Sequence, residues 1–297
     1  MKILAMTLAL AAAPVLAGTP IDETRPLASD GRLLVENLKG RISIEGWDRE
    51  EVHVGGTLGE GVERLRIGNG GDTLSVVVEY PESRGWFFNW GSNDSEPTTL
   101  VIRAPRGVAL ELESVSADIE AGGLRGPSLQ AESVSGDVRL RLAAAEVVVE
   151  TVSGDQDLEI EATRLSAESV SGDIRAQGSL SGRVNVETVS GSARVQAREV
   201  SEFVGATVSG DLGFEGSLAA GGDLRAEALS GDIEVRIDRP AGLRVTAESF
   251  SGRIGSDLGE VKEAEYGPGR SLEARVGDGA TRLRLESFSG DITLELR

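Results

Sequence analysis

The chain has 297 residues, with 49 Asp and Glu against 30 Lys and Arg, and a formal net charge of −19 at pH 7. This excess of negative charge disfavours nucleic acids and anionic membrane surfaces as partners. The chain has one histidine and no cysteine, which excludes disulfides and thiol chemistry and disfavours the usual transition-metal sites.

Residues 1–17 have the pattern of a bacterial secretory signal peptide. Lys2 precedes an apolar run that ends in small residues, so cleavage is expected after Ala17. The run is too short and too rich in alanine to favour a membrane-spanning helix, and the alternative is a buried helix of the mature fold. We therefore expect an exported protein of the periplasm or cell surface, with no transmembrane segment after cleavage.

Residues 18–97 are predicted to form an irregular β section. Turns rich in glycine and asparagine separate segments that favour strands. Residues 36–42 read E-N-L-K-G-R-I, an imperfect first copy of the repeated phrase described below. Such irregularity is typical of the section that caps a stack of repeats. The strands are expected near residues 32–36, 41–45, 51–54, 62–67 and 73–79.

Residues 81–97 interrupt the strand pattern and are expected to form a loop between two prolines. The segment is rich in Gly, Ser and Asn, and it contains four aromatic residues, Trp86, Phe87, Phe88 and Trp90. These side chains could fold back and plug the end or flank of the fold. Alternatively, they could form an exposed patch that binds sugar rings, lipid headgroups or a partner protein. They are the candidate binding residues.

A seven-residue phrase recurs through residues 98–297. It reads E-S-V-S-G-D-V at 132–138 and E-S-V-S-G-D-I at 168–174. Successive copies start 18 to 21 residues apart, except for a last gap of 38, which indicates a copy that has decayed or been replaced. A fixed period near 20 is the signature of stacked coils. The other copies start at Glu113, Glu150, Glu187, Ala206, Glu227, Glu248 and Glu286.

Apolar residues alternate with polar ones on both sides of the phrase, as in Val147 and Val149 before it and Val138 and Leu140 after it. This alternation is typical of strands with one buried face. Each coil is therefore expected to hold two short strands that meet at the phrase, with a looser second turn, and to gain its burial by stacking on its neighbours. The sequence predicts an all-β solenoid, a parallel β-helix-like stack that continues the irregular section as one domain.

The corner of each coil is expected to be the turn typified by Ser135, Gly136 and Asp137. A corner between strands often needs a positive φ angle, which glycine adopts without steric cost. The serine hydroxyl can bond nearby backbone groups and form a ladder from coil to coil. Only Ala117 departs from glycine at this position. The corner glycines are Gly136, Gly154, Gly172, Gly191, Gly210, Gly231, Gly252 and Gly290.

Two acidic rows should result from the stacking, one from the Asp of each phrase and one from its first Glu. Like charges in register lie about 5 Å apart, which destabilises the fold unless something relieves the repulsion. Arg139, Arg175 and Arg194 could do so, as could divalent cations such as Ca²⁺. The alternative is that the carboxylates are solvated and keep the protein soluble. One carboxylate per coil falls short of a six-oxygen cage, so we expect no metal site and no cofactor.

Catalysis is not expected. The acidic residues recur in every coil, whereas a catalytic site should be a local departure from the repeat. His53 lies in an alternating E-V-H-V segment and is interpreted as a surface residue of a strand. The absence of cysteine excludes Cys–His catalysis, and the serines have no histidine nearby in the sequence pattern to activate them.

Residues 255–285 form a second irregular part, expected to be a hairpin around Gly267-Pro268-Gly269 that leads back into the stack. The chain then ends at Arg297, in the second strand of the final copy. An open last coil would expose unpaired backbone groups to another chain. We expect residues 255–285 to cover this edge and the protein to be a monomer; the alternative is that the edge docks a partner.

Several motifs together resemble a bacterial putative-adhesin family of envelope proteins with β-strand repeats. They are E-N-L-K-G-R-I-S-I-E-G-W-D at 36–48, the serial V-S-G-D-I phrases, Y-G-P-G at 266–269 and L-E-S-F-S-G-D-I-T-L at 285–294. The resemblance covers about residues 30–297. It implies a β-solenoid and an exported location, and it carries over no catalytic residue.

Three functions follow as hypotheses. The first is an adhesin or interaction module of the envelope that binds a glycan or a protein partner. The second is a structural or stress-related envelope scaffold. The third is a polysaccharide-active β-helix enzyme, which the repetition of the acidic residues disfavours.

Overall fold

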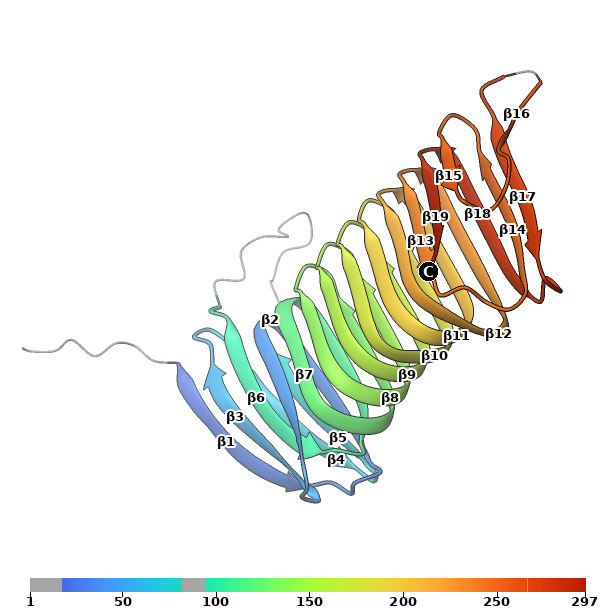
Figure 1. The fold of residues 1–297 in the computed structure, drawn as a ribbon. Helices are drawn as coiled ribbons and strands as arrows, with labels where there is room; N and C mark the ends of the chain where they lie inside the picture. The colour runs from blue at the N-terminus through green and yellow to red at the C-terminus, as the bar shows by residue number, and fades with distance from the viewer. Residues whose placement is uncertain (1–17, 82–94, 266) are drawn as a thin grey trace, which may run out of the picture.

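The computed structural model describes residues 18–81, 95–265 and 267–297. The expected signal peptide and the aromatic residues Trp86, Phe87, Phe88 and Trp90 lie outside these ranges, so the hypotheses about them stay predictions. The regular elements of the described ranges are all strands, and none of these residues forms a helix that could cross a membrane. The predicted all-β solenoid is confirmed (Figure 1).

Nineteen strands are distributed along the described residues. They are β1 (Thr19–Pro26), β2 (Arg32–Trp47), β3 (Glu51–Leu58), β4 (Arg64–Gly70), β5 (Thr73–Glu79), β6 (Thr98–Pro105), β7 (Ala109–Ser133), β8 (Val138–Thr151), β9 (Gln156–Ser169), β10 (Ile174–Thr188), β11 (Ala193–Ser209), β12 (Leu212–Ser230), β13 (Ile233–Ile237), β14 (Leu243–Ser249), β15 (Ile254–Ser256), β16 (Lys262–Glu263), β17 (Arg270–Val276), β18 (Thr281–Ser289) and β19 (Ile292–Leu296).

Each central strand runs from one corner to the next and bends in between, so that its two arms face each other. Figure 1 shows these bent strands as a row of parallel coils with the corners along one side. β8 pairs in parallel with β9 in a register shifted by one repeat, with Val138 opposite Gln156 and Val149 opposite Ala167. The alternating apolar residues of both arms, such as Leu140 and Val147, are fully buried between the two layers. The core is therefore a narrow strip that runs the length of the stack.

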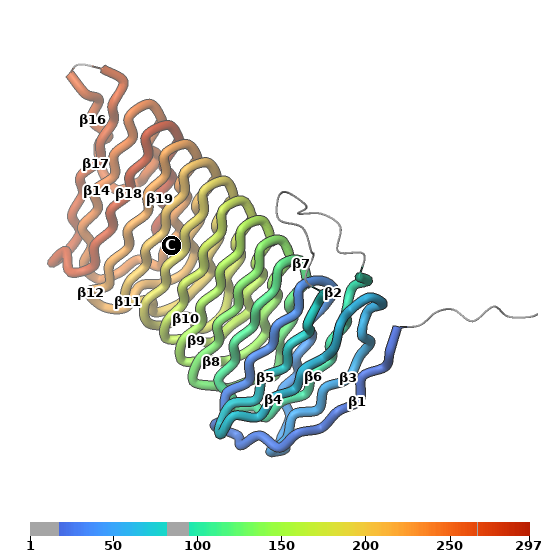
Figure 2. The backbone as a smooth tube through the Cα atoms, turned by 180° about the vertical axis from the view of Figure 1, so that it is seen from behind, coloured from blue at the N-terminus to red at the C-terminus, as the bar shows by residue number. Residues whose placement is uncertain are grey.

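The N-terminal section closes one end of the stack. β2 carries the imperfect first copy and stacks directly on β7, with Glu36 opposite Glu113. On the other side of β2, β5 and β6 pair in parallel with its two halves. Antiparallel strands then finish the layers, β4 beside β5, and β3 and β1 beyond β6 (Figure 2). β1 has prolines at positions 20 and 26 and little apolar alternation, so the sequence did not predict it, although proline is common in edge strands.

The last copies stack out of chain order, which corrects two expectations. β18 lies between β12 and β14, and β19 lies between β13 and β15. The gap of 38 residues is therefore no decayed copy. The chain first forms the end coil from β14 and β15, and it then returns to place β18 and β19 between that coil and the coil of β12 and β13. The C-terminal strand is consequently internal, and the expectation that it forms the open edge is wrong. Residues 255–285 do cover an edge, since β17 pairs antiparallel with β14.

Candidate functional site: a groove along the corners

Most corners are closed by the hydroxyl of a largely buried side chain; the exceptions in the described chain are Ala228, which has none, and Thr207, whose Oγ1 has no hydrogen-bond partner. The second residue of the phrase accepts the backbone N–H three residues later, at 2.8 Å from Gly172 N to Ser169 Oγ and 3.0 Å from Gly191 N to Thr188 Oγ1. The serine before the glycine points the other way and donates to the previous coil, as Ser135 Oγ does to the Val115 carbonyl at 3.1 Å. In these corners both hydroxyls therefore satisfy backbone groups.

The corner glycines do not have positive φ angles, so that expectation is wrong. None of the eight is among the residues with positive φ, whereas Gly178 and Gly216 at the opposite bends have φ of 131° and 143°. The corner requires glycine for a different reason, which is the close approach of neighbouring backbones. A Cβ on Gly172 would lie 2.0 Å from the carbonyl oxygen of Gly154, and one on Gly154 would lie 2.0 Å from that of Gly136.

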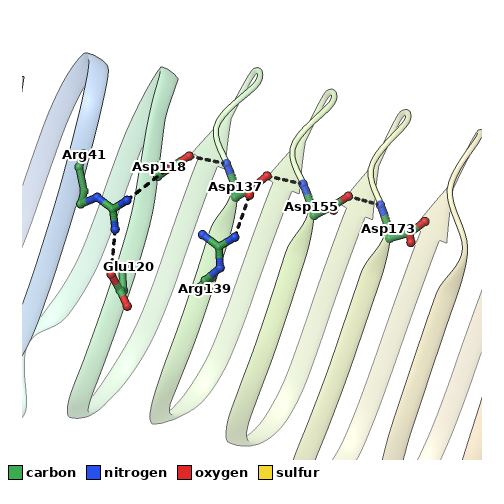
Figure 3. A network of polar contacts seen from close by, with 7 residues as sticks. All are labelled: Arg41, Asp118, Glu120, Asp137, Arg139, Asp155 and Asp173. Carbon is green, nitrogen blue, oxygen red and sulfur yellow. Dashed lines mark hydrogen bonds and ion pairs between the residues drawn. The ribbon is translucent and has the colours of Figure 1, made fainter. Parts of the chain in front are cut away.

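The aspartate row accepts hydrogen bonds from the backbone of the following coils and pairs with nearby arginines. Asp137 N and Asp155 N each donate to the aspartate of the preceding coil at 3.2 Å, and Asp173 N donates at 2.9 Å (Figure 3). Arg139 pairs with Asp137 and Arg175 with Asp173, each at 2.9 Å. Across the described ranges, no group of three or more acidic or histidine side chains is arranged to hold a metal ion.

An exposed apolar row runs along the corners. The third residue of each phrase is 40 to 54% exposed, although it is apolar in every copy. At the C-terminal end, the rings of Phe250 and Phe288 stack with centroids 4.8 Å apart and planes tilted by 7°. A continuous apolar row on a solvent-facing edge is a common feature of interaction surfaces. In stacking order, the row is Val115, Val134, Val152, Val170, Val189, Val208, Leu229, Phe288 and Phe250.

A glutamate row runs beside the apolar row. The first residue of each phrase lies opposite its counterpart in the next coil, as Glu132, Glu150, Glu168 and Glu187 do. Burial raises the pKa of Glu150 above its ordinary value, and the neighbouring carboxylates Glu132 and Glu168 raise it further. The pKa of Glu113 is raised by the same two causes.

The charges of the glutamate row are compensated only towards its C-terminal end. There Arg225 pairs with Glu227 and Arg284 pairs with Glu286. For the five glutamates from Glu113 to Glu187, no lysine or arginine of the described chain lies within ion-pair distance. This half of the row is therefore a line of uncompensated negative charge.

The two rows line one elongated groove of about 1150 Å³. It extends along the corners from the coil of Glu113 to that of Glu248, and Arg270 and Ser271 of β17 border its far end. Arg270 Nη1 donates to the Gly252 carbonyl at 2.7 Å and so ties β17 to the last corner. The acidic rows were expected from the sequence, but the groove was not. The sequence did contain a signal for it, because the apolar third residue of each phrase lies two positions after the outward first residue and therefore faces the same side.

Two departures from the repeat lack catalytic geometry. His53 on β3 lies near Thr24 Oγ1 at 3.2 Å and Asp22 Oδ1 at 3.8 Å, but both approach the same nitrogen, Nδ1, so the acid cannot orient the ring for the hydroxyl. Gln156 replaces an apolar core residue, and its amide donates to Thr151 Oγ1 at 3.0 Å and to the Glu168 carbonyl at 2.7 Å. Gln156 therefore stabilises a corner through hydrogen bonds from the core side.

Comparisons with known proteins identify the family. The sequence matches the Toastrack DUF4097 family over residues 32–295, and the chain belongs to this family. No curated protein matches the sequence.

Several solved structures are similar to this chain at low sequence identity. A protein from Parabacteroides distasonis described as a putative lipid binding protein is 17% identical, with a TM-score of 0.53 over 93% of this chain and 97% of the other. A putative adhesin from Bacteroides fragilis is 13% identical, with a TM-score of 0.40 over 73% and 97% of the two chains. A putative cell adhesion protein from Clostridium sporogenes is 11% identical, with a TM-score of 0.26 over 94% and 100%.

Proposed function

We propose that this Toastrack protein is an exported, non-catalytic binding protein of the bacterial cell envelope, and that the corner groove is its binding surface. The observation that carries the proposal is the row of apolar side chains that stays exposed in every coil from Val134 to Phe250. Exposure of an apolar side chain at the same place in each repeat is unfavourable in water unless a partner covers it. The secretory pattern of residues 1–17 supports the envelope location.

The groove also supports binding rather than catalysis. Its walls largely repeat a glutamate, a hydroxyl residue and an apolar residue from coil to coil, and the departures at Ala206 and Ala228 remove a polar group rather than add one. Repetition instead suits a partner that is itself long and contacts many coils at once. A purely structural rod would need the aspartate ladder and the close-packed corners, but it would have no use for the apolar row.

The proposal is tested by changing the apolar row without changing the core. Val152→Ser and Val170→Ser together replace two side chains that are 46% and 48% exposed, and Val101→Ser is a matched control because Val101 is 47% exposed but lies on β6, outside the groove. The mature protein should retain a partner from envelope extract, and the double variant should lose it while the control keeps it. Equal retention by all three proteins would contradict the proposal.

Export is tested separately. The full chain should be found in the periplasmic or surface fraction, and its N-terminus there should begin at Gly18. Accumulation of uncleaved chain in the cytoplasm would show that residues 1–17 are no signal peptide.

A further inference from the structure

We infer that the groove binds an amphipathic α-helix with a basic stripe beside its apolar face. This inference rests on the proposed function and names the chemistry of the partner. It follows from three properties of the groove, which are the distance between its two rows, the repeat along each row and the uncompensated charge of one row.

The two rows are close enough for one helix to cover both. In the five coils from Glu113 to Glu187 the glutamate and the apolar residue are two positions apart in the chain, with a hydroxyl residue between them. Glu150, for example, lies at the end of β8, and Val152 follows the last residue of that strand. Residues two apart in a chain are at most about 7 Å apart, whereas a helix with its side chains is about 10 Å wide. A helix that lies along the groove can therefore place its apolar face on the valines and a neighbouring stripe on the glutamates.

The repeat along the groove favours a helix over an extended chain. Neighbouring coils are about 4.8 Å apart, and a helix presents a new row of side chains every turn of about 5.4 Å, a slip of roughly 0.6 Å per coil. Side chains on one face of an extended strand recur only every ~6.7 Å, so such a chain loses register after one or two coils. Long lysine and arginine side chains can absorb the small slip of the helix over several coils.

Charge complementarity specifies the polar stripe of the partner. Glu113, Glu132, Glu150, Glu168 and Glu187 lie in line without a lysine or arginine partner in the described chain. Basic groups placed along this line would relieve the repulsion that raises the pKa of Glu113 and Glu150. An anionic lipid or an acidic peptide would increase the repulsion, and a neutral acyl chain would leave the carboxylates uncompensated.

The test uses synthetic peptides and the mature protein. A peptide of about 16 residues spans about 24 Å as a helix, which matches the five uncompensated coils. One peptide carries Leu and Lys in a helical pattern, the second has the same composition in strict alternation, and the third has the helical pattern with Glu in place of Lys. The described residues of the protein form no helix, so a gain of negative signal at 222 nm beyond the sum of the separate protein and peptide spectra reports helix in the peptide.

Binding and a gain of helical signal are expected for the first peptide, with affinity that falls as salt is added. The alternating peptide should bind about tenfold more weakly, or worse, because it loses register, and the acidic peptide should not bind. Equal affinity for the two basic peptides, or binding without a gain of helix, would overturn the inference in favour of unspecific attraction by a negative surface.

Variants locate the site. Glu150→Gln with Glu168→Gln should weaken the helical peptide about tenfold, since two charge pairs are lost. Asp157→Asn with Glu161→Gln removes the same charge outside the groove and should leave affinity unchanged. Melting temperatures no lower than that of the parent protein would show that the variants are folded, and equal loss in both pairs would contradict the assignment to the groove. If no peptide binds while the valine variant still loses its envelope partner, this inference fails and the proposed function stands.

Discussion

At the scale of single residues, the corner glycines and the groove glutamates have properties that depend on contacts with the neighbouring coil. The recurrence of Ser, Gly and Asp in the phrase was sufficient to predict where the corners lie. It was insufficient to predict why glycine is needed, because the contact that excludes a side chain is made with the coil below. The groove glutamates illustrate the same limit, since their raised pKa depends on neighbours one repeat away in the sequence.

The first prediction concerns a corner glycine. Gly172→Ala should lower the free energy of unfolding by about 1–3 kcal/mol, because the new Cβ would lie 2.0 Å from the Gly154 carbonyl oxygen and force the coils apart. Gly70→Ala is the matched control, since a Cβ there meets no atom within 4 Å. Thermal or urea unfolding measures both. A Gly172→Ala protein as stable as the control would show that the corners are looser than the structure indicates.

The second prediction concerns the pH dependence of a groove glutamate. The pKa of Glu150 is raised in the folded protein, so the folded state favours the protonated form, and the ionised form destabilises the fold above that pKa. Glu150→Gln should therefore raise the melting temperature at pH 7, and this advantage should vanish below the unfolded-state pKa of about 4.3. Melts of both proteins across this range test the sign. Stabilisation that persists unchanged at low pH would have another cause.

At the scale of elements, alternation of apolar residues predicted most strands, and it failed where order in space differs from order in the chain. The segment 73–79 was predicted with its observed bounds, and 32–36 with 41–45 proved to be the two halves of β2. The insertion of β18 between β12 and β14 could not be predicted. Every coil presents the same apolar row and the same corner to both neighbours, so the sequence of a copy does not specify which copy lies beside it.

The third prediction tests the edge that β17 covers. Deletion of residues 261–275 removes β16 and most of β17 and should expose the backbone of β14, whose only other partner in the described chain is β18. Unpaired edges invite another chain to add on, so the shortened protein should form dimers or larger species. Light scattering measures the mass, with the full mature chain, expected to be a monomer, as the reference. A shortened protein that stays monomeric would show that β17 does not protect the edge.

At the scale of the whole molecule, much of the negative charge lies in two rows, which differ in how far hydrogen bonds and arginines compensate it. The aspartate row is satisfied by backbone N–H groups and arginines, as in Asp155 N to Asp137 at 3.2 Å, and it gains little from added cations. The glutamate row is uncompensated over half its length, but it offers one carboxylate per coil, and neighbouring carboxylates diverge too little to surround an ion with six oxygens. The rows therefore attract positive charge as an extended line.

The fourth prediction follows from this arrangement. Millimolar Ca²⁺ should raise the melting temperature by a few degrees, and Mg²⁺ should act similarly, because both screen a net charge of −19 without entering a defined cage. NaCl at the same ionic strength is the control for general screening. Calorimetry should show weak heats without a sharp end point for either ion. Tight, stoichiometric binding of Ca²⁺ alone would require a cage that one carboxylate per coil does not supply, and it would then have to be built by residues outside the two rows.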